Sequence, residues 1–259
     1  MNPRTFRVVA GTLLFLGVAF IALVAVLHFV VGDSSDSAID ATTMIATTST
    51  TVPPPTTTMA TTTTRRVERR DLLDALQAGI VEAEFRSTGG ASGDIVKLAI
   101  RLLAATDDVV TLSVPAGMML TNPAGGEQDL VIRGLVGVMT GEFTYQEVTE
   151  IELPDVEWRD YVVEAYCAEA HDDNPTADGV LTASGLAGED LIGVFAALGE
   201  AGDDIDLQVI QAVIWAVTDD IRTDQLDDIG YGLDEAGVAQ ARDIIERAGL
   251  DPGEFRLFR

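Results

Sequence analysis

The longest uncharged run of the chain decides which residues can form a compact domain. Residues 8–32 contain no Asp, Glu, Lys or Arg, and a helix of roughly 20 apolar residues is long enough to cross a bilayer. Arg4 and Arg7 precede this run and Asp33 follows it, so the positive-inside rule places the N-terminus in the cytoplasm. The run is too long for the core of a cleaved signal peptide and has no A-x-A cleavage pattern. We therefore expect a cytoplasmic tail at residues 1–7, a single-pass transmembrane signal anchor at residues 8–32 that places the protein in the plasma membrane, and an extracellular remainder.

A low-complexity segment follows the predicted anchor. Residues 42–64 read "TTMIATTSTTVPPPTTTMATTTT", a Thr/Pro tract with too little apolar periodicity to pack a core. The basic sequence "RRVERR" ends the segment at residue 70. We expect a disordered stalk over residues 33–70 and one folded extracytoplasmic domain over residues 71–259.

The charge balance excludes one class of partner. The formal net charge is -26, and no basic patch with interleaved aromatic residues occurs after residue 71. An acidic surface repels phosphate backbones, so we expect no nucleic-acid partner. The predicted contact with a membrane is limited to residues 8–32.

The first part of the predicted domain has the pattern of strands. Asp71 is a plausible N-cap for a short amphipathic helix over residues 71–85. Beyond it, apolar residues alternate with polar or small ones in "DIVKLAIRLL" and "VVTLSV", and "DLVIRGLVGVM", "YQEVTEIEL" and "RDYVVEAYC" continue the strand pattern between short turns. Successive strands with short connections indicate an antiparallel, β-sandwich-like sheet over about residues 93–167.

The second part of the predicted domain has the pattern of helices. Residues 188–202 and 203–221 have apolar residues at helical spacing, and residues 234–249 form a third such segment with Asp234 as its expected N-cap. The predicted fold class is therefore α+β, with the sheet followed by a C-terminal helical subdomain over about residues 185–259.

Two residues are unusual for their surroundings. Cys167 is the only cysteine of the chain, and strand alternation places it on an uncharged face with Tyr161, Val163 and Ala165. Gln211 lies in a helical segment that is apolar nearly all round, where a buried carboxamide must find hydrogen-bond partners. A lone cysteine and a buried glutamine both require an explanation.

The residues around these two positions resemble the thioester domains of bacterial surface adhesins. In that family a cysteine that follows an aromatic residue near a strand end joins a helical glutamine in a motif close to T-Q-x-A-I-W, often continued by T-D. Tyr166 and Cys167 match the first motif, and the second is matched by Gln211, Ile214, Trp215, Thr218 and Asp219. Ile210 and Val213 depart from it, standing where the family has threonine and alanine. The blocks "VPAG", "AYC…NP" and "IQAVIW" are also similar to those of bacterial exported domains of the same kind, and the likeness covers most of residues 71–259.

The resemblance implies acyl transfer without a cofactor or metal. The Cys167 thiolate would attack the Gln211 carboxamide, ammonia would leave, and the thioester would later capture an amine on a surface protein or glycan. Tyr166, Trp215, Thr218 and Asp219 would shape the site. This implies a cell-surface adhesin rather than an enzyme with turnover, because each site could react only once.

Other interpretations stay open at the level of sequence. Cys167, Gln211 and Trp215 can each be ordinary core residues of a non-reactive extracellular binding or structural domain. His171 with Asp172, Asp173 and Cys167 could instead indicate a metal-dependent or cysteine enzyme. However, "HDDNP" has the composition of a turn, and catalytic pairs normally come from segments distant in sequence.

Overall fold

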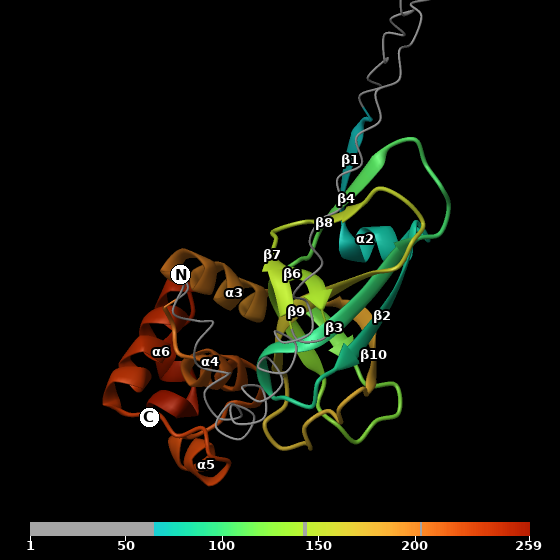
Figure 1. Ribbon diagram of the computed structural model, residues 1–259. Coiled ribbons are helices and arrows are strands. Elements are labelled where there is room, and N and C mark those ends of the chain that lie inside the picture. The colour runs from blue at the N-terminus through green and yellow to red at the C-terminus, as the bar shows by residue number, and fades with distance from the viewer. Residues whose placement is uncertain (1–64, 142–143, 203) are drawn as a thin grey trace, which may run out of the picture. The chain divides into compact units, whose positions relative to one another are not determined.

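The computed structural model describes residues 65–141, 144–202 and 204–259. Figure 1 shows strands in the first part of this region and helices α3 to α6 gathered beside them. The strands are β1 (Val67–Asp71), β2 (Val81–Ser87), β3 (Ser92–Leu102), β4 (Val109–Ser113), β5 (Met118–Thr121), β6 (Leu130–Gly141), β7 (Thr144–Glu147), β8 (Ile151–Leu153), β9 (Arg159–Cys167) and β10 (Val180–Leu186). The α-helices are α2 (Leu72–Gln77), α3 (Glu189–Ala201), α4 (Leu207–Asp219), α5 (Thr223–Asp228) and α6 (Glu235–Arg247).

Six antiparallel strands close into a barrel. Their order is β5-β10-β2-β3-β9-β6, and β6 pairs with β5 again, which joins the first strand to the last. Strand β7 extends this sheet as a hairpin with β6. Closure removes the free strand edges that an open sheet would present.

The barrel interior follows from strand alternation. Along β3 the inward residues Val96, Leu98 and Ile100 are fully buried, whereas Lys97 between them is exposed. The pairing of Val96 with Val163 and of Leu98 with Tyr161 extends this inward face to β9. Cys167 belongs to the same face because it follows Val163 by four residues. The thiol is therefore on the side of the barrel core.

A smaller sheet joins the start of the domain to the barrel. Strand β1 runs parallel to β4, and β4 pairs with β8. The Arg65 guanidinium donates to the carbonyl oxygen of Asp107 at 3.0 Å and to that of Pro154 at 2.8 Å. Residues from 65 onward are thus part of the folded domain.

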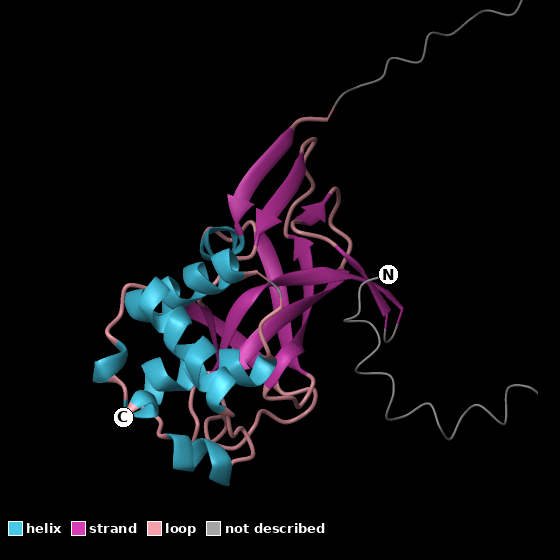
Figure 2. Cartoon of the chain, turned by 90° about the vertical axis from the view of Figure 1, so that its left-hand side faces the viewer, coloured by secondary structure: helices cyan, strands magenta, loops and turns pink. Residues whose placement is uncertain are grey.

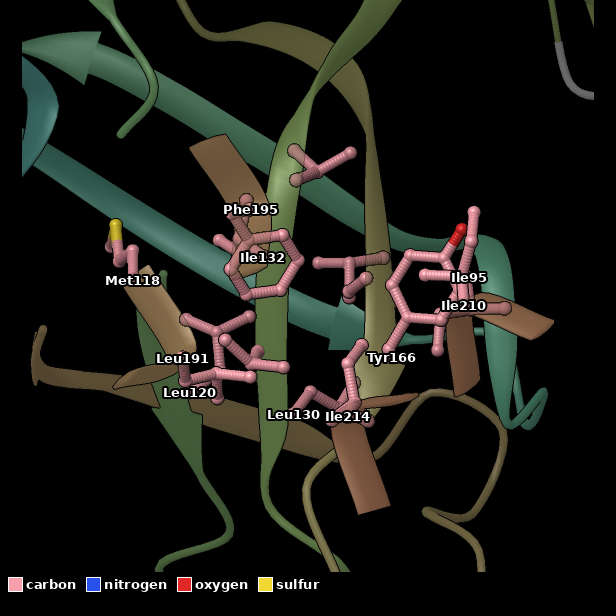
Figure 3. Close-up of a cluster of buried hydrophobic side chains, with 14 of the residues drawn as sticks. Ile95, Met118, Leu120, Leu130, Ile132, Tyr166, Leu191, Phe195, Ile210 and Ile214 are labelled. Carbon is pink, nitrogen blue, oxygen red and sulfur yellow. The ribbon is translucent and has the colours of Figure 1, made fainter. Parts of the chain in front are cut away.

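The C-terminal helices pack against the strands through their apolar faces. Helix α4 is the most buried of them, with eight consecutive buried residues from Val209 to Ala216. In Figure 3, Leu191 and Phe195 of α3 and Ile210 and Ile214 of α4 lie in one cluster with strand residues. Figure 2 shows the same segregation of helices to one side of the sheet.

The predicted fold class is confirmed at the level of α+β, with a largely antiparallel sheet followed by a helical part. The N-caps Asp71 and Asp234 also occur as predicted, since each side chain accepts a backbone N–H of the first turn of its helix. Helices α3, α4 and α6 coincide with the three predicted segments.

Three expectations about the sheet and the stalk are corrected. The sheet is a closed barrel rather than sandwich-like, because β5 pairs with both β10 and β6. The β part extends from residue 67 to residue 186 instead of 93–167, since β1, β2 and β10 are also strands. The predicted stalk ends too late, because residues 67–70 are held in β1 by main-chain pairing with β4.

The predicted helix over residues 71–85 is also shorter than expected. The helix stops at Gln77, and Val81, Ala83 and Phe85 alternate in β2 to face the barrel. The leucines with helical spacing lie in or near α2, but the residues after them pair with the long strand β3, and this pairing prevents the helix from continuing to residue 85.

The predicted anchor at residues 8–32 and most of the predicted stalk lie outside the described residues. Within the described part of the chain, none of the helices has the length and apolar character needed to cross a membrane.

We predict that Leu98→Ala lowers the free energy of unfolding by about 2–5 kcal/mol, because it leaves a cavity in the closed barrel. Chemical denaturation monitored by circular dichroism would measure the change. Lys97→Ala, on the exposed face of the same strand, is the matched control and should change the value by less than about 0.5 kcal/mol. Equal losses in both variants would contradict the inward assignment of Leu98.

Candidate functional site

The structure brings Cys167 and Gln211 together from segments that are 44 residues apart. Cys167 is the last residue of β9, and Gln211 lies in the second turn of α4. Both residues are fully buried. The glutamine that the motif singled out is therefore the one that contacts the cysteine.

The contact consists of two reciprocal hydrogen bonds to the main chain. Gln211 Nε2 donates to the Cys167 carbonyl oxygen at 2.7 Å, and the Cys167 N–H donates to Gln211 Oε1 at 3.2 Å. A carboxamide offers the same donor and acceptor as a peptide group, so it can take the place of a neighbouring strand. Here it does so for the Cys167 carbonyl oxygen. The Cys167 N–H is shared, because the Ala91 carbonyl oxygen, just before β3, also accepts it at 3.0 Å.

The thiol itself has a different hydrogen-bond partner. Cys167 Sγ lies 3.9 Å from Asn174 Oδ1 and donates to it weakly. Burial, with a smaller contribution from the Glu169 carboxylate, raises the pKa of the Cys167 thiol to about 12. The sulfur is accordingly protonated at neutral pH, and a base would have to remove its proton before or during nucleophilic attack.

A second connection holds the same two segments together. Asp219, at the end of α4, accepts the Ala170 N–H through Oδ2 at 2.6 Å. Cys167 is three residues before Ala170, and Gln211 is eight residues before Asp219. The chain after β9 is therefore attached to α4 near both of its ends, which fixes the site from two sides.

Three other predicted site residues, Thr218, Trp215 and Tyr166, make their contacts away from the Cys167 sulfur. Thr218 donates to the Ile214 carbonyl oxygen at 3.1 Å, and buried Trp215 meets Tyr231 edge to face at 4.9 Å between ring centroids. Thr218 thus bonds within α4, and Trp215 packs the helix against Tyr231, while its buried indole N–H has no partner among the described residues. Tyr166 points to the opposite face of β9 from Cys167, and its hydroxyl donates to Glu164 Oε1 at 2.5 Å.

An acidic groove of about 630 Å³ opens beside the site. Ala168, directly after Cys167, and Thr218, near the end of α4, are among the residues that line it. Four carboxylate residues line it, and none of the described lining residues is basic. These carboxylates belong to Glu169, Glu189, Asp190 and Asp219. The groove thus favours cationic groups on electrostatic grounds.

Three neighbours of the site were not predicted from the sequence. They are Gln128, Glu169 and Asn174, of which Asn174 contacts the sulfur and Glu169 lines the groove. Burial raises the pKa of the Glu169 carboxyl; the hydrogen bond from the Asp129 N–H opposes this shift, and the nearby carboxylates of Asp129, Asp219 and Asp172 add to it. Asn174 was visible only as part of the "AYC…NP" block, and Gln128 carried no signal because it lies in the loop before β6 and is placed by its hydrogen bonds to residues 172–174.

The residues named for a metal-dependent or cysteine enzyme, His171, Asp172 and Asp173, lie in the loop that follows β9. His171 is exposed, and the hydrogen bond of the Cys167 sulfur goes to Asn174. Among the residues that the structure describes, no group of three or more His, Cys, Asp or Glu side chains could hold a metal ion.

No protein-family model, no curated protein and no solved structure matches the chain.

We predict that Gln211→Met destabilises the domain by about 1–3 kcal/mol, because the Cys167 carbonyl would be buried without its partner. Gln208→Met is the matched control, since Gln208 is exposed one turn earlier on α4, and its effect should stay within about 0.5 kcal/mol. Thermal and denaturant unfolding would measure both changes. A Gln211→Met domain as stable as the control would contradict the role of this carboxamide in joining helix to strand.

Proposed function

We propose that this protein is a membrane-anchored surface protein whose domain forms an internal thioester between Cys167 and Gln211. The observation that carries the proposal is the reciprocal hydrogen-bonded contact between these two buried residues. The two residues that resemble the reactive pair of adhesin thioester domains are thus neighbours in space. Residues 8–32 would supply the anchor.

The bond-forming step follows from the groups in contact. The Cys167 sulfur bonds to the Gln211 side-chain carbonyl carbon, the carbon–nitrogen bond breaks, and the thiol proton leaves with the nitrogen as ammonia. The Cys167 N–H already donates to Gln211 Oε1. A backbone donor at this oxygen stabilises the negative charge that develops there during attack.

The geometry of the attack requires one rearrangement. Side chains stand roughly perpendicular to the plane in which a strand forms its main-chain hydrogen bonds. The Gln211 carboxamide lies in that plane, beside the Cys167 main chain, whereas the Cys167 sulfur points out of it. Rotation of the carboxamide out of the plane would bring its carbon toward the sulfur. Burial of both residues restricts competing hydrolysis while the thioester persists.

The capture step would use the acidic groove. An amine bonds to the acyl carbon, the carbon–sulfur bond breaks, and the sulfur takes up a proton released by the amine, so an amide and a free thiol result. Protonated amines would gather at the four carboxylates of the groove. One of these, Glu169, has a raised pKa, which suits it to take a proton from an arriving ammonium group. An amine on a surface protein or glycan would then become covalently attached.

A specific observation also favours a second candidate function. Both polar groups of the Gln211 carboxamide are satisfied by Cys167, and the thiol has a raised pKa. In this alternative Gln211 is a structural link, and the domain is an extracellular module that binds a partner without covalent chemistry.

We predict that the intact mass of the full-length chain falls short of the calculated value by one ammonia. Methylamine should abolish the shortfall by adding to Gln211 and should release a thiol that alkylates. Gln211→Ala should show its full calculated mass, because it has no side-chain acyl group to lose ammonia.

Gln208→Ala is the control for these measurements and should keep the wild-type shortfall. A wild-type chain with its full calculated mass, and with Cys167 freely alkylated after denaturation, would rule out the thioester and leave the non-covalent binding module.

A further inference from the structure

The immediate surroundings of the Cys167 sulfur form a short polar chain that the proposed reaction has not used. Cys167 Sγ donates to Asn174 Oδ1 at 3.9 Å, and Gln128 Nε2 donates to the same oxygen at 3.4 Å. One side-chain oxygen thus connects the thiol to a second carboxamide.

Asn174 lies between the buried thiol and the solvent. Cys167 is fully buried, whereas Asn174 is exposed although its side-chain oxygen reaches the sulfur. Pro175, which follows it, is buried and restricts the backbone of Asn174 to extended conformations. The asparagine side chain is therefore directed inward from a surface loop, over the sulfur.

Gln128 holds this loop in place from the interior. Its Nε2 also donates to the Asp172 carbonyl oxygen at 2.7 Å, and its backbone N–H donates to the Asp173 carbonyl oxygen at 2.9 Å. Gln128 is only 4% exposed. Three hydrogen bonds from one buried residue therefore fix the position of residues 172–174.

The same carboxamide has an acceptor without a partner. Gln128 Oε1 is buried and accepts no hydrogen bond from the described residues. A buried acceptor without a donor is costly, and it is satisfied when a small molecule that carries N–H or O–H groups lies beside it. Ammonia, water and a primary amine are such molecules.

We propose that Asn174 is the positioning residue that holds the Cys167 sulfur and controls the access of small molecules to the sulfur and to the acyl carbon bonded to it, with Gln128 as its buried anchor. This inference rests on the proposed thioester for its chemical role. When an amine displaces the sulfur from the acyl carbon, the sulfur regains a proton. The new thiol then donates a hydrogen bond to Asn174 Oδ1. While the thioester persists, the same side chain keeps water from the acyl group.

The test compares Asn174→Ala with Asp173→Ala in the full-length chain. Asp173 is the matched control because it precedes Asn174 in the same exposed loop and contacts Gln128 through its main-chain carbonyl rather than through its side chain. One readout is the rate at which N-ethylmaleimide alkylates the free thiol of the native protein. Methylamine first releases this thiol wherever a thioester is present. The second readout is the rate at which the ammonia shortfall disappears through hydrolysis.

We expect Asn174→Ala to raise both rates on the order of tenfold, because the reactivity of a thiol follows its access to solvent. Asp173→Ala should leave both rates unchanged. Asn174→Asp keeps a side-chain oxygen of the same reach and should not raise them. Equal melting temperatures in all three variants would separate access from loss of folding.

Two results would overturn the inference. One is an alkylation rate in Asn174→Ala equal to that of the wild type, and the other is an equal increase in Asp173→Ala, which would mean general loosening of the loop. If a wild-type ammonia shortfall accompanies either result, the proposed thioester stands and only the role of Asn174 fails. If alkylation rises in Asn174→Ala alone but no shortfall exists, Asn174 screens the sulfur and the thioester fails.

Discussion

The attachment of α4 to the barrel depends on one glutamine side chain at the end of a strand. Cys167 ends β9 just where its neighbour β3 begins. The Gln211 carboxamide donates to the Cys167 carbonyl oxygen and shares the Cys167 N–H with the Ala91 carbonyl oxygen. Because both groups are buried, an unmade bond here would cost far more than the net gain of one made. This contact sets the position of α4 against the barrel, and the Asp219 contact with Ala170 reinforces it.

The closed barrel gives this contact its chemical interest. Closure and the packing of α3 and α4 remove Cys167 from water, which raises the pKa of its thiol and keeps it protonated. A protonated, shielded sulfur is a poor nucleophile toward reagents in solution but can react with a group held beside it, because proximity replaces collision. The same burial would protect a thioester once formed. The structural link and the proposed reaction thus use the same two residues.

Much of this fold follows from local patterns in the sequence. The alternation of Val96, Leu98 and Ile100 predicts β3, because a strand buried on one face has apolar residues at every second position. The apolar run around Gln211 predicts a buried α4, because a helix inside a core is apolar on all its faces. Closure of the barrel could not be predicted, because β5 pairs not only with the next strand, β6, but also with β10, where Thr121 and Thr182 are 61 residues apart. Strand β2 was missed since the leucines before it have helical spacing.

Some residues of the site could be predicted from the sequence, and others could not. Cys167 and Gln211 stood out because each is anomalous for its surroundings, a lone thiol and an amide in an apolar helix, and the resemblance to thioester domains assigned them to one site. Gln128 and Glu169 gave no such signal. Gln128 is a loop residue that is buried through its contacts with a second loop, residues 172–174, and Glu169 looks like any acidic residue of a loop. Tyr166 lies on the face of β9 opposite Cys167, in the same buried cluster as Ile210, the residue before Gln211.

The most direct test of the central claim is to digest the native full-length chain with pepsin at low pH, without reduction, and to sequence the products by tandem mass spectrometry. The account predicts a single species that joins the peptide of Cys167 to the peptide of Gln211 and lacks one ammonia. Two separate peptides, each with its full calculated mass, would contradict a bond between these residues and leave Gln211 as a hydrogen-bonded link alone.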